Sequence, residues 1–231
     1  MPPMTQALSF KESAVKFDGI GFLSKAGQGK ARQISAQNNR RFQALRRSIS
    51  AVRSFASAQT VCTQDTDEDR QKIIALVLAA RILEIAEAAL LVMKNGMSNE
   101  ANNLFRVFLD TYFVNANVCS DTAFVSRYFK SDEAARLKLI NAAREHKSKL
   151  FKAINEYATR ALHDALQKDI AEEKIQAFSS YAYAGNVGCS EIYDSMYRLA
   201  SGSVHTTPRA LEKYVEEDGE GNVIFDKRLP A

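Results

Sequence analysis

Arg198 and His205 stand seven positions apart near the end of the chain, in RLASGSVH, with Ser201 between them. On a helix that turns about 100° per residue, these three side chains would lie along one stripe. A guanidinium holds a phosphate through paired hydrogen bonds, and an imidazole exchanges a proton near neutral pH. The pattern therefore predicts RNA cleavage without a metal, in which His205 moves protons and Arg198 stabilises charge on phosphorus. The alternative is the polar end of an ordinary helix, where a terminal histidine caps backbone carbonyls.

A second polar pair interrupts an otherwise apolar helix, NNLFRVFLDTYFVNANV (102–118). Arg106 and Asp110 are i, i+4 neighbours on this helix, and phenylalanines and leucines flank them. Two interpretations are open. The pair is either a surface ion pair worth a few tenths of a kcal/mol, or a polar pair that faces the site and holds the last helix or the histidine in place.

The remaining histidines and the cysteines show no metal-binding pattern. His146 and His163 lie in highly charged helical surroundings, which is typical of solvated surface histidines. The three cysteines are far apart in the chain and match no ligand spacing, which favours reduced thiols. We therefore expect no metal and no cofactor.

Positive charge gathers in the first quarter of the chain. Residues 1–61 contain ten Lys or Arg and two acidic residues, whereas the remainder contains more acidic than basic residues. A basic segment predicts an acidic partner such as RNA, and we expect RNA contacts from Arg40, Arg41, Arg46 and Arg47. The alternative is a solvated helix face that packs on the acidic remainder.

The composition is that of a soluble protein, with 46% hydrophobic and 25% charged residues. No uncharged apolar run approaches the length of about 18 residues that a membrane helix needs, and the first residues lack the apolar centre of a signal peptide. These features predict a cytoplasmic protein without a membrane partner.

Hydrophobic periodicity predicts an all-α fold, a bundle of five to seven helices followed by a small C-terminal β-hairpin. We expect a loosely ordered lead-in over 1–33, a basic amphipathic helix over 34–61, a bundle core over 62–211, and a hairpin and tail over 212–231. Within the core the expected helices are 65–94, 98–119, 121–129, 131–157, 171–183 and 190–202.

Two sets of residues carry a resemblance to known proteins. KNGMSNEANNLFRVFLDTYFVNANV, followed by YDSMYRLASGSVHTTPRAL, resembles an uncharacterised bacterial family of unknown function over about residues 65–215. That family has an Arg-x-x-x-acid element, matched by Arg106 and Asp110, although glutamate is commoner than aspartate there. Its later Tyr-Arg-x-x-Ser-x-x-x-His element is matched by Tyr197, Arg198, Ser201 and His205.

The later element also resembles the Arg-x(4–6)-His signature of the HEPN superfamily (higher eukaryotes and prokaryotes nucleotide-binding domains). Six residues separate Arg198 from His205, at the long end of that range, and the intervening serines and glycine differ from the commoner polar insert. Many HEPN domains are helical bundles that dimerise and cut RNA without a metal in toxin–antitoxin, abortive-infection and CRISPR-linked systems, while others are inactive binding modules.

The resemblance implies a homodimeric endoribonuclease in toxin or anti-phage defence, with Arg198, His205 and Ser201 as catalytic residues. Arg106, Asp110 and Tyr197 would support them, and a partner protein or antitoxin would control the activity. The alternative is a non-catalytic helical module that binds RNA, a nucleotide or a partner protein. A third hypothesis is a partner-dependent subunit that oligomerises through the apolar helices 73–92 and 101–118.

Overall fold

The computed structural model describes residues 21–22, 24–61, 64, 66–146, 149–204, 215–217 and 223–225. The described part of the chain is overwhelmingly helical, which confirms the all-α expectation. Within it, no helix combines the length and apolar composition needed to cross a bilayer.

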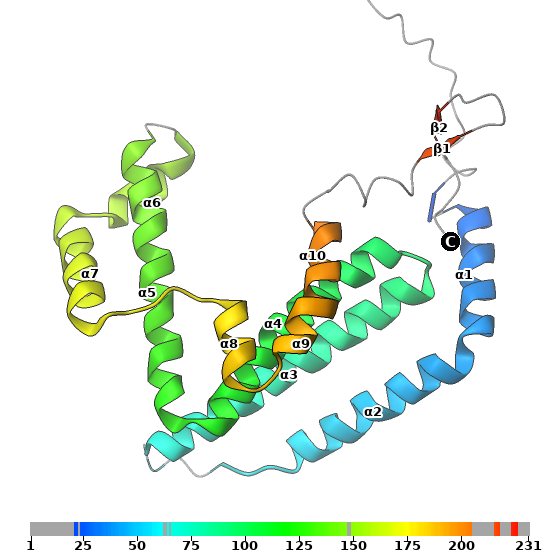
Figure 1. Cartoon of the computed structure of the whole chain (residues 1–231), viewed down its shortest axis with the longest axis horizontal. Helices are drawn as coiled ribbons and strands as arrows, with labels where there is room; N and C mark the ends of the chain where they lie inside the picture. The colour runs from blue at the N-terminus through cyan, green and yellow to red at the C-terminus, as the bar shows by residue number, and fades with distance from the viewer. Residues whose placement is uncertain are drawn as a thin grey trace, which may run out of the picture.

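A long antiparallel helix pair forms the centre of the molecule (Figure 1). α3 (Asp67–Lys94) begins at Thr66, whose hydroxyl accepts a hydrogen bond from the Asp69 amide. Its first turn is acidic, which suits the positive end of the helix dipole. Gly96 adopts a φ of 77°, a conformation that favours glycine, and the chain turns there into α4 (Ser98–Ser120). The sequence therefore predicted this helix pair correctly.

The last helical segment lies along α4 (Figure 1). It runs through α9 (Ser190–Ile192), η3 (Tyr193–Tyr197) and α10 (Arg198–Val204) without leaving a helical conformation. α8 (Ser180–Asn186) also packs on α4. The core between these elements consists of Leu109, Phe113, Ala184 and Tyr197. Burial of these side chains holds residues 198–201 (RLAS) against α4.

The middle of the chain differs from the predicted pattern. The expected helices 121–129 and 131–157 are instead α5 (Thr122–Glu145), the short η2 (Lys149–Phe151) and α6 (Lys152–Tyr157). Ser131, the first residue of the expected helix 131–157, is buried inside α5, where its hydroxyl donates to the Tyr128 carbonyl. That local bond satisfies the serine without breaking the helix.

The expected helix 171–183 is also wrong. α7 (Arg160–Glu173) ends at Lys174, which adopts a left-handed φ of 52°. Residues 174–179 are not helical, and α8 begins after Ser179, whose hydroxyl accepts from the Ala182 amide. The spacing of apolar residues does not reveal that one helix ends at Lys174 and the next begins after Ser179.

The basic N-terminal region contains two helices where one was expected. α1 (Lys25–Gln37) begins inside the predicted lead-in, because Ser24 caps it by accepting from the Gly27 amide. α2 (Asn39–Ser57) follows after Asn38, whose side-chain amide donates to the Ile34 carbonyl and competes with helix continuation. The rest of the predicted lead-in, residues 1–20 and 23, lies outside the described residues.

α1 to α10 outnumber the expected five to seven helices, mainly because predicted single helices are divided. After α10, the described residues include two three-residue strands, β1 (Val215–Glu217) and β2 (Val223–Phe225), which pair antiparallel with Val215 opposite Phe225. The other residues of the predicted hairpin and tail lie outside the described part.

Candidate functional site

A four-residue polar network joins α4, α8 and η3. The Arg106 Nε donates to the Tyr197 hydroxyl at 3.1 Å, and the Arg106 guanidinium lies 5.3 Å from the centre of the Tyr197 ring. The Tyr197 hydroxyl in turn lies 3.2 Å from the Ser180 Oγ and 3.4 Å from the Asp110 Oδ2. Ser180 donates to the other carboxylate oxygen of Asp110. The network therefore holds the start of the RLAS segment against α4 through charge-assisted contacts.

This geometry corresponds to the second interpretation of the Arg106–Asp110 pair. Both side chains are half-buried and meet at the hydroxyl of Tyr197, on the last helical segment. Sequence reasoning identified three of the four members but missed Ser180. Ser180 is separated from Asp110 by 70 positions, and nothing in the local sequence distinguishes it from other serines.

Arg198 lies beside this network but points to solvent. Its Nε forms an ion pair with the Asp194 Oδ1 at 3.0 Å, and its side chain is 66% exposed. Its guanidinium lies 5.8 Å from the centre of the Tyr193 ring. Asp194 was also missed by sequence reasoning, although its i, i+4 spacing from Arg198 is a recognisable signal.

The other two predicted catalytic residues are Ser201, which the structure describes, and His205, which it does not. The Ser201 hydroxyl donates to the Tyr197 carbonyl at 2.9 Å, so its hydrogen is used within the helix. His205 lies outside the described residues.

The helix is locally widened directly before Arg198. Tyr193–Tyr197 form a π-helical turn between the α-helical turns on either side. Such single-turn insertions in α-helices occur frequently at functional sites. Here the turn contributes Tyr193 and Tyr197, whose rings stack with centres 4.7 Å apart.

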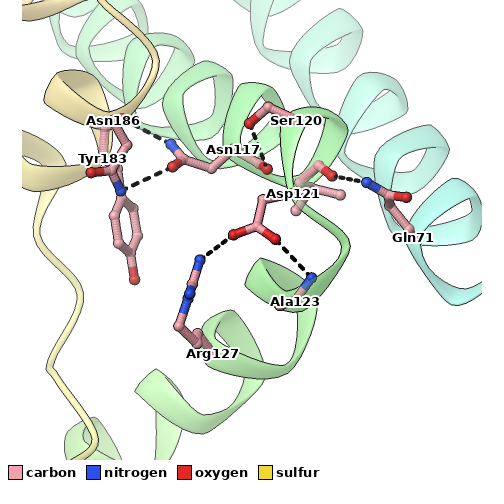
Figure 2. A network of polar contacts seen from close by, with 9 residues as sticks. Gln71, Asn117, Ser120, Asp121, Ala123, Arg127, Tyr183 and Asn186 are labelled. Atoms are coloured by element: carbon pink, nitrogen blue, oxygen red, sulfur yellow. Dashed lines mark hydrogen bonds and ion pairs between the residues drawn. The ribbon is translucent and has the colours of Figure 1, made fainter. Parts of the chain in front are cut away.

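A second network fixes the corner where α4 meets α5 and also anchors α8 (Figure 2). The Asn117 side-chain amide donates to the carbonyls of Phe113 and Tyr183, and its oxygen accepts from Asn186. Gln71 of α3 donates to the Val118 carbonyl at 2.6 Å. Because α8 carries Ser180, this corner helps to position the four-residue network.

A cavity of about 970 Å³ lies next to this corner, bordered by α4, α5, α8 and residues 173–176. Its wall is mixed in charge: Arg127 is ion-paired with Asp121, and Lys130 with Glu173. These pairings neutralise two of its cations, so the wall offers little unpaired positive charge to an anionic ligand.

The four arginines expected to contact RNA all lie on α2 and are exposed: Arg40, Arg41, Arg46 and Arg47. α2 packs on α3 through Phe42, which is 4% exposed, and through an ion pair of 2.8 Å between Arg53 and Glu87. Part of the basic segment therefore does pack on the acidic remainder, as the alternative interpretation expected, while these four arginines face solvent.

Of the two histidines expected at the surface, only His146 is exposed. The His163 side chain is 14% exposed, and its ring nitrogens lie 2.9 Å from the Asp164 Oδ1 and 3.0 Å from the Asn141 Oδ1. The hydrogen bond with His163 lowers the pKa of the Asp164 carboxyl. The contact with Asn141 joins α7 to α5.

Among the described residues, no three His, Cys, Asp or Glu side chains form a group that could hold a metal ion.

The polar network makes a stability prediction. Tyr197→Phe keeps the ring that packs against Phe113 but removes the hydroxyl shared by Arg106, Asp110 and Ser180. Leaving these half-buried groups without that partner is expected to lower the free energy of unfolding by about 1–2 kcal/mol. Urea unfolding measures the change, with Tyr157→Phe at a 78% exposed position as the control. Equal stability of the two variants would contradict an anchoring role.

The comparisons with known proteins identify a family. A family model described as a family of unknown function, DUF5677, matches residues 72–222, which is more than half of the chain. The match includes the whole four-residue network and all of the second network except Gln71. No curated protein and no solved structure is detectably similar to the chain. The match agrees with the resemblance noted over residues 65–215, and the chain belongs to the DUF5677 family, whose function is unknown.

Proposed function

We propose that this protein is a metal-independent endoribonuclease of the HEPN type, with Arg198 and His205 at its active site. The observation that carries the proposal is the presentation of Arg198. Its helix is anchored by the buried and half-buried side chains of the four-residue polar network. The Arg198 side chain itself stays 66% exposed beside Asp194. A rigidly supported and solvent-accessible guanidinium suits the binding of a phosphate.

The proposed reaction needs a proton carrier and a cation, but no metal. The 2′-oxygen of a ribose attacks the adjacent phosphorus and loses its proton to His205, while the bond from phosphorus to the 5′-oxygen breaks. The leaving 5′-oxygen takes up a proton from water, His205 returns its proton to the solvent, and a 2′,3′-cyclic phosphate remains. Arg198 stabilises the negative charge that develops on the phosphoryl oxygens.

Supporting residues fall into two groups in this proposal. Arg106, Asp110 and Tyr197 position the helix that carries Arg198, and Ser201 contributes to the same helix through its bond to the Tyr197 carbonyl. The exposed α2 arginines add contacts to the RNA backbone, which salt would weaken. A homodimer, in a toxin or anti-phage setting with a controlling partner protein, is the biological context that we propose.

A second candidate is a non-catalytic RNA-binding module in the cytoplasm. The observation that favours it is the pairing of Arg198 with Asp194, together with its position over the Tyr193 ring. A guanidinium whose charge is partly neutralised by a neighbouring carboxylate stabilises developing charge on a phosphate less well, which suits a binding role better than catalysis.

Incubating total RNA with the purified full-length protein in EDTA distinguishes the two candidates. An endoribonuclease of this type cuts RNA in EDTA and leaves 2′,3′-cyclic phosphate ends. Arg198→Ala, purified in parallel, is expected to cut about 10²-fold more slowly, because a charge-stabilising donor is lost. Binding of RNA without any cutting, by a folded protein, would refute the endoribonuclease and support the binding module. Equal cutting by wild type and Arg198→Ala would remove Arg198 from the active site.

A further inference from the structure

The side chains of Tyr181, Tyr193, Tyr197 and Arg198 contact one another in a row, which we call the tyrosine ladder. The Tyr181 ring contacts the Tyr193 ring edge-to-face, with centres 5.3 Å apart. Tyr193 stacks on Tyr197 at 4.7 Å, and the guanidinium of Arg198 lies 5.8 Å from the Tyr193 ring centre. The ladder therefore contains three tyrosines drawn from α8 and the π-helical turn, and it includes the arginine that we propose as a phosphate ligand.

The two ends of this ladder differ in burial. Tyr197 is 6% exposed and packs against Phe113, so the inner end belongs to the core. Tyr181 is 60% exposed, and Arg198 is exposed as well. Tyr181 and Arg198 both lie beside the Tyr193 ring, and exposed aromatic rings and guanidinium groups are the side chains on which unpaired nucleobases stack in single-strand-binding proteins.

We infer that Tyr181, together with Tyr193 and Arg198, forms a stacking subsite for an unpaired nucleobase of the RNA. This inference rests on the proposed function, because it assigns the phosphate next to that base to Arg198. Bases within a duplex are stacked on their neighbours and cannot present a free face to Tyr181. The subsite therefore selects single-stranded RNA and places an unpaired nucleotide at the scissile phosphate.

Binding of 2′-O-methyl RNA tests the subsite, because this RNA lacks the 2′-hydroxyl and cannot be cut by the proposed reaction. Fluorescence anisotropy with the full-length protein measures the affinity for a labelled single strand and for the same strand in a duplex. We expect Tyr181→Ala to weaken single-strand binding by about 5- to 150-fold, the cost of losing one stacked base. Duplex binding should change little, and Tyr181→Phe, which keeps an aromatic ring, should bind the single strand nearly as well as wild type.

Tyr157→Ala is the matched control, since Tyr157 is an exposed tyrosine on α6 and takes no part in the ring contacts of Tyr181, Tyr193 and Tyr197. The inference is overturned if Tyr181→Ala binds the single strand as tightly as Tyr157→Ala does, or if it loses duplex affinity to the same extent. Both substitutions replace exposed side chains, so folding, checked by circular dichroism, should be preserved in each.

The subsite and the proposed reaction fail in different ways. RNA cleavage by wild type, with single-strand affinity independent of Tyr181, would refute the subsite alone. Single-strand affinity that depends on Tyr181, without any cleavage of unmodified RNA, would refute the endoribonuclease and leave the stacking subsite in place. A folded wild-type protein that binds neither strand form would overturn both.

Discussion

His205→Ala is expected to slow RNA cleavage by about 10²- to 10⁴-fold, the usual contribution of a positioned general acid or base. In the proposed reaction this side chain takes the proton of the attacking 2′-hydroxyl, and alanine has no group that could do so. The initial rate of cleavage of a defined RNA strand in EDTA measures the effect. Affinity for uncleavable 2′-O-methyl RNA should change much less, because Arg198 and Tyr181 remain.

His146→Ala is the control for this prediction. His146 is an exposed histidine at the C-terminal end of α5, where it stacks on Phe151 at 5.9 Å. The His146→Ala variant should cut RNA at the wild-type rate. His163 is unsuitable for this purpose, since its contact with Asn141 joins α7 to α5. Cleavage by His205→Ala at the rate of His146→Ala would exclude His205 from the reaction.

Phe113→Ala is expected to lower the free energy of unfolding by about 3–5 kcal/mol, the range for a large aromatic side chain removed from a packed core. Phe113 is fully buried on α4, where it packs against Leu109, Ala184 and Tyr197. Its ring supports both α8 and the π-helical turn, so the substitution leaves a cavity beneath the tyrosine ladder. Urea unfolding at 25 °C gives the change.

Tyr112→Ala, at the adjacent position, is the matched control for the core prediction. Tyr112 is 39% exposed on the same helix, and its loss should cost about 1 kcal/mol. If the two variants were equally stable, the packing of α8 and the last helical segment on α4 would be wrong. The position of Ser180 and Tyr197 at the candidate site depends on that packing.

The sequence predicted the central helix pair well, because its signals are local. Acidic residues in the first turn of α3 suit the helix dipole, and Gly96 supplies the positive φ of the turn that follows. The apolar positions of α4 recur at helical spacing, and five of them are buried: Ala101, Leu109, Phe113, Val114 and Val118. The separation of Arg106 from Asp110 placed both residues on one face of this helix without any tertiary information.

Where prediction failed, a long-range contact or a local polar bond outweighed the periodic pattern. Ser131 looked like a helix start, but it lies inside α5 with its hydroxyl bonded to the preceding turn. His163 stood among charged residues, yet the packing of α7 on α5 largely covers it. Residues 24–33 belong to the expected loosely ordered lead-in, although Ser24 caps α1 there and Gly27 is buried where a Cβ would meet the Gly21 carbonyl.

The candidate site also combines local features, which the sequence predicts, with contacts between distant residues, which it does not. Its chemical groups on the last helix are adjacent in the sequence, and both the Arg198 motif and the i, i+4 partner Asp194 are local features. The contacts of Tyr197 with Arg106, Asp110 and Ser180 span between 17 and 91 positions of chain. Such contacts arise only when burial of Phe113 and its neighbours brings α8 and the last helix onto α4. The sequence by itself therefore determined which residues could do chemistry, and the packing of the core decided which of them meet.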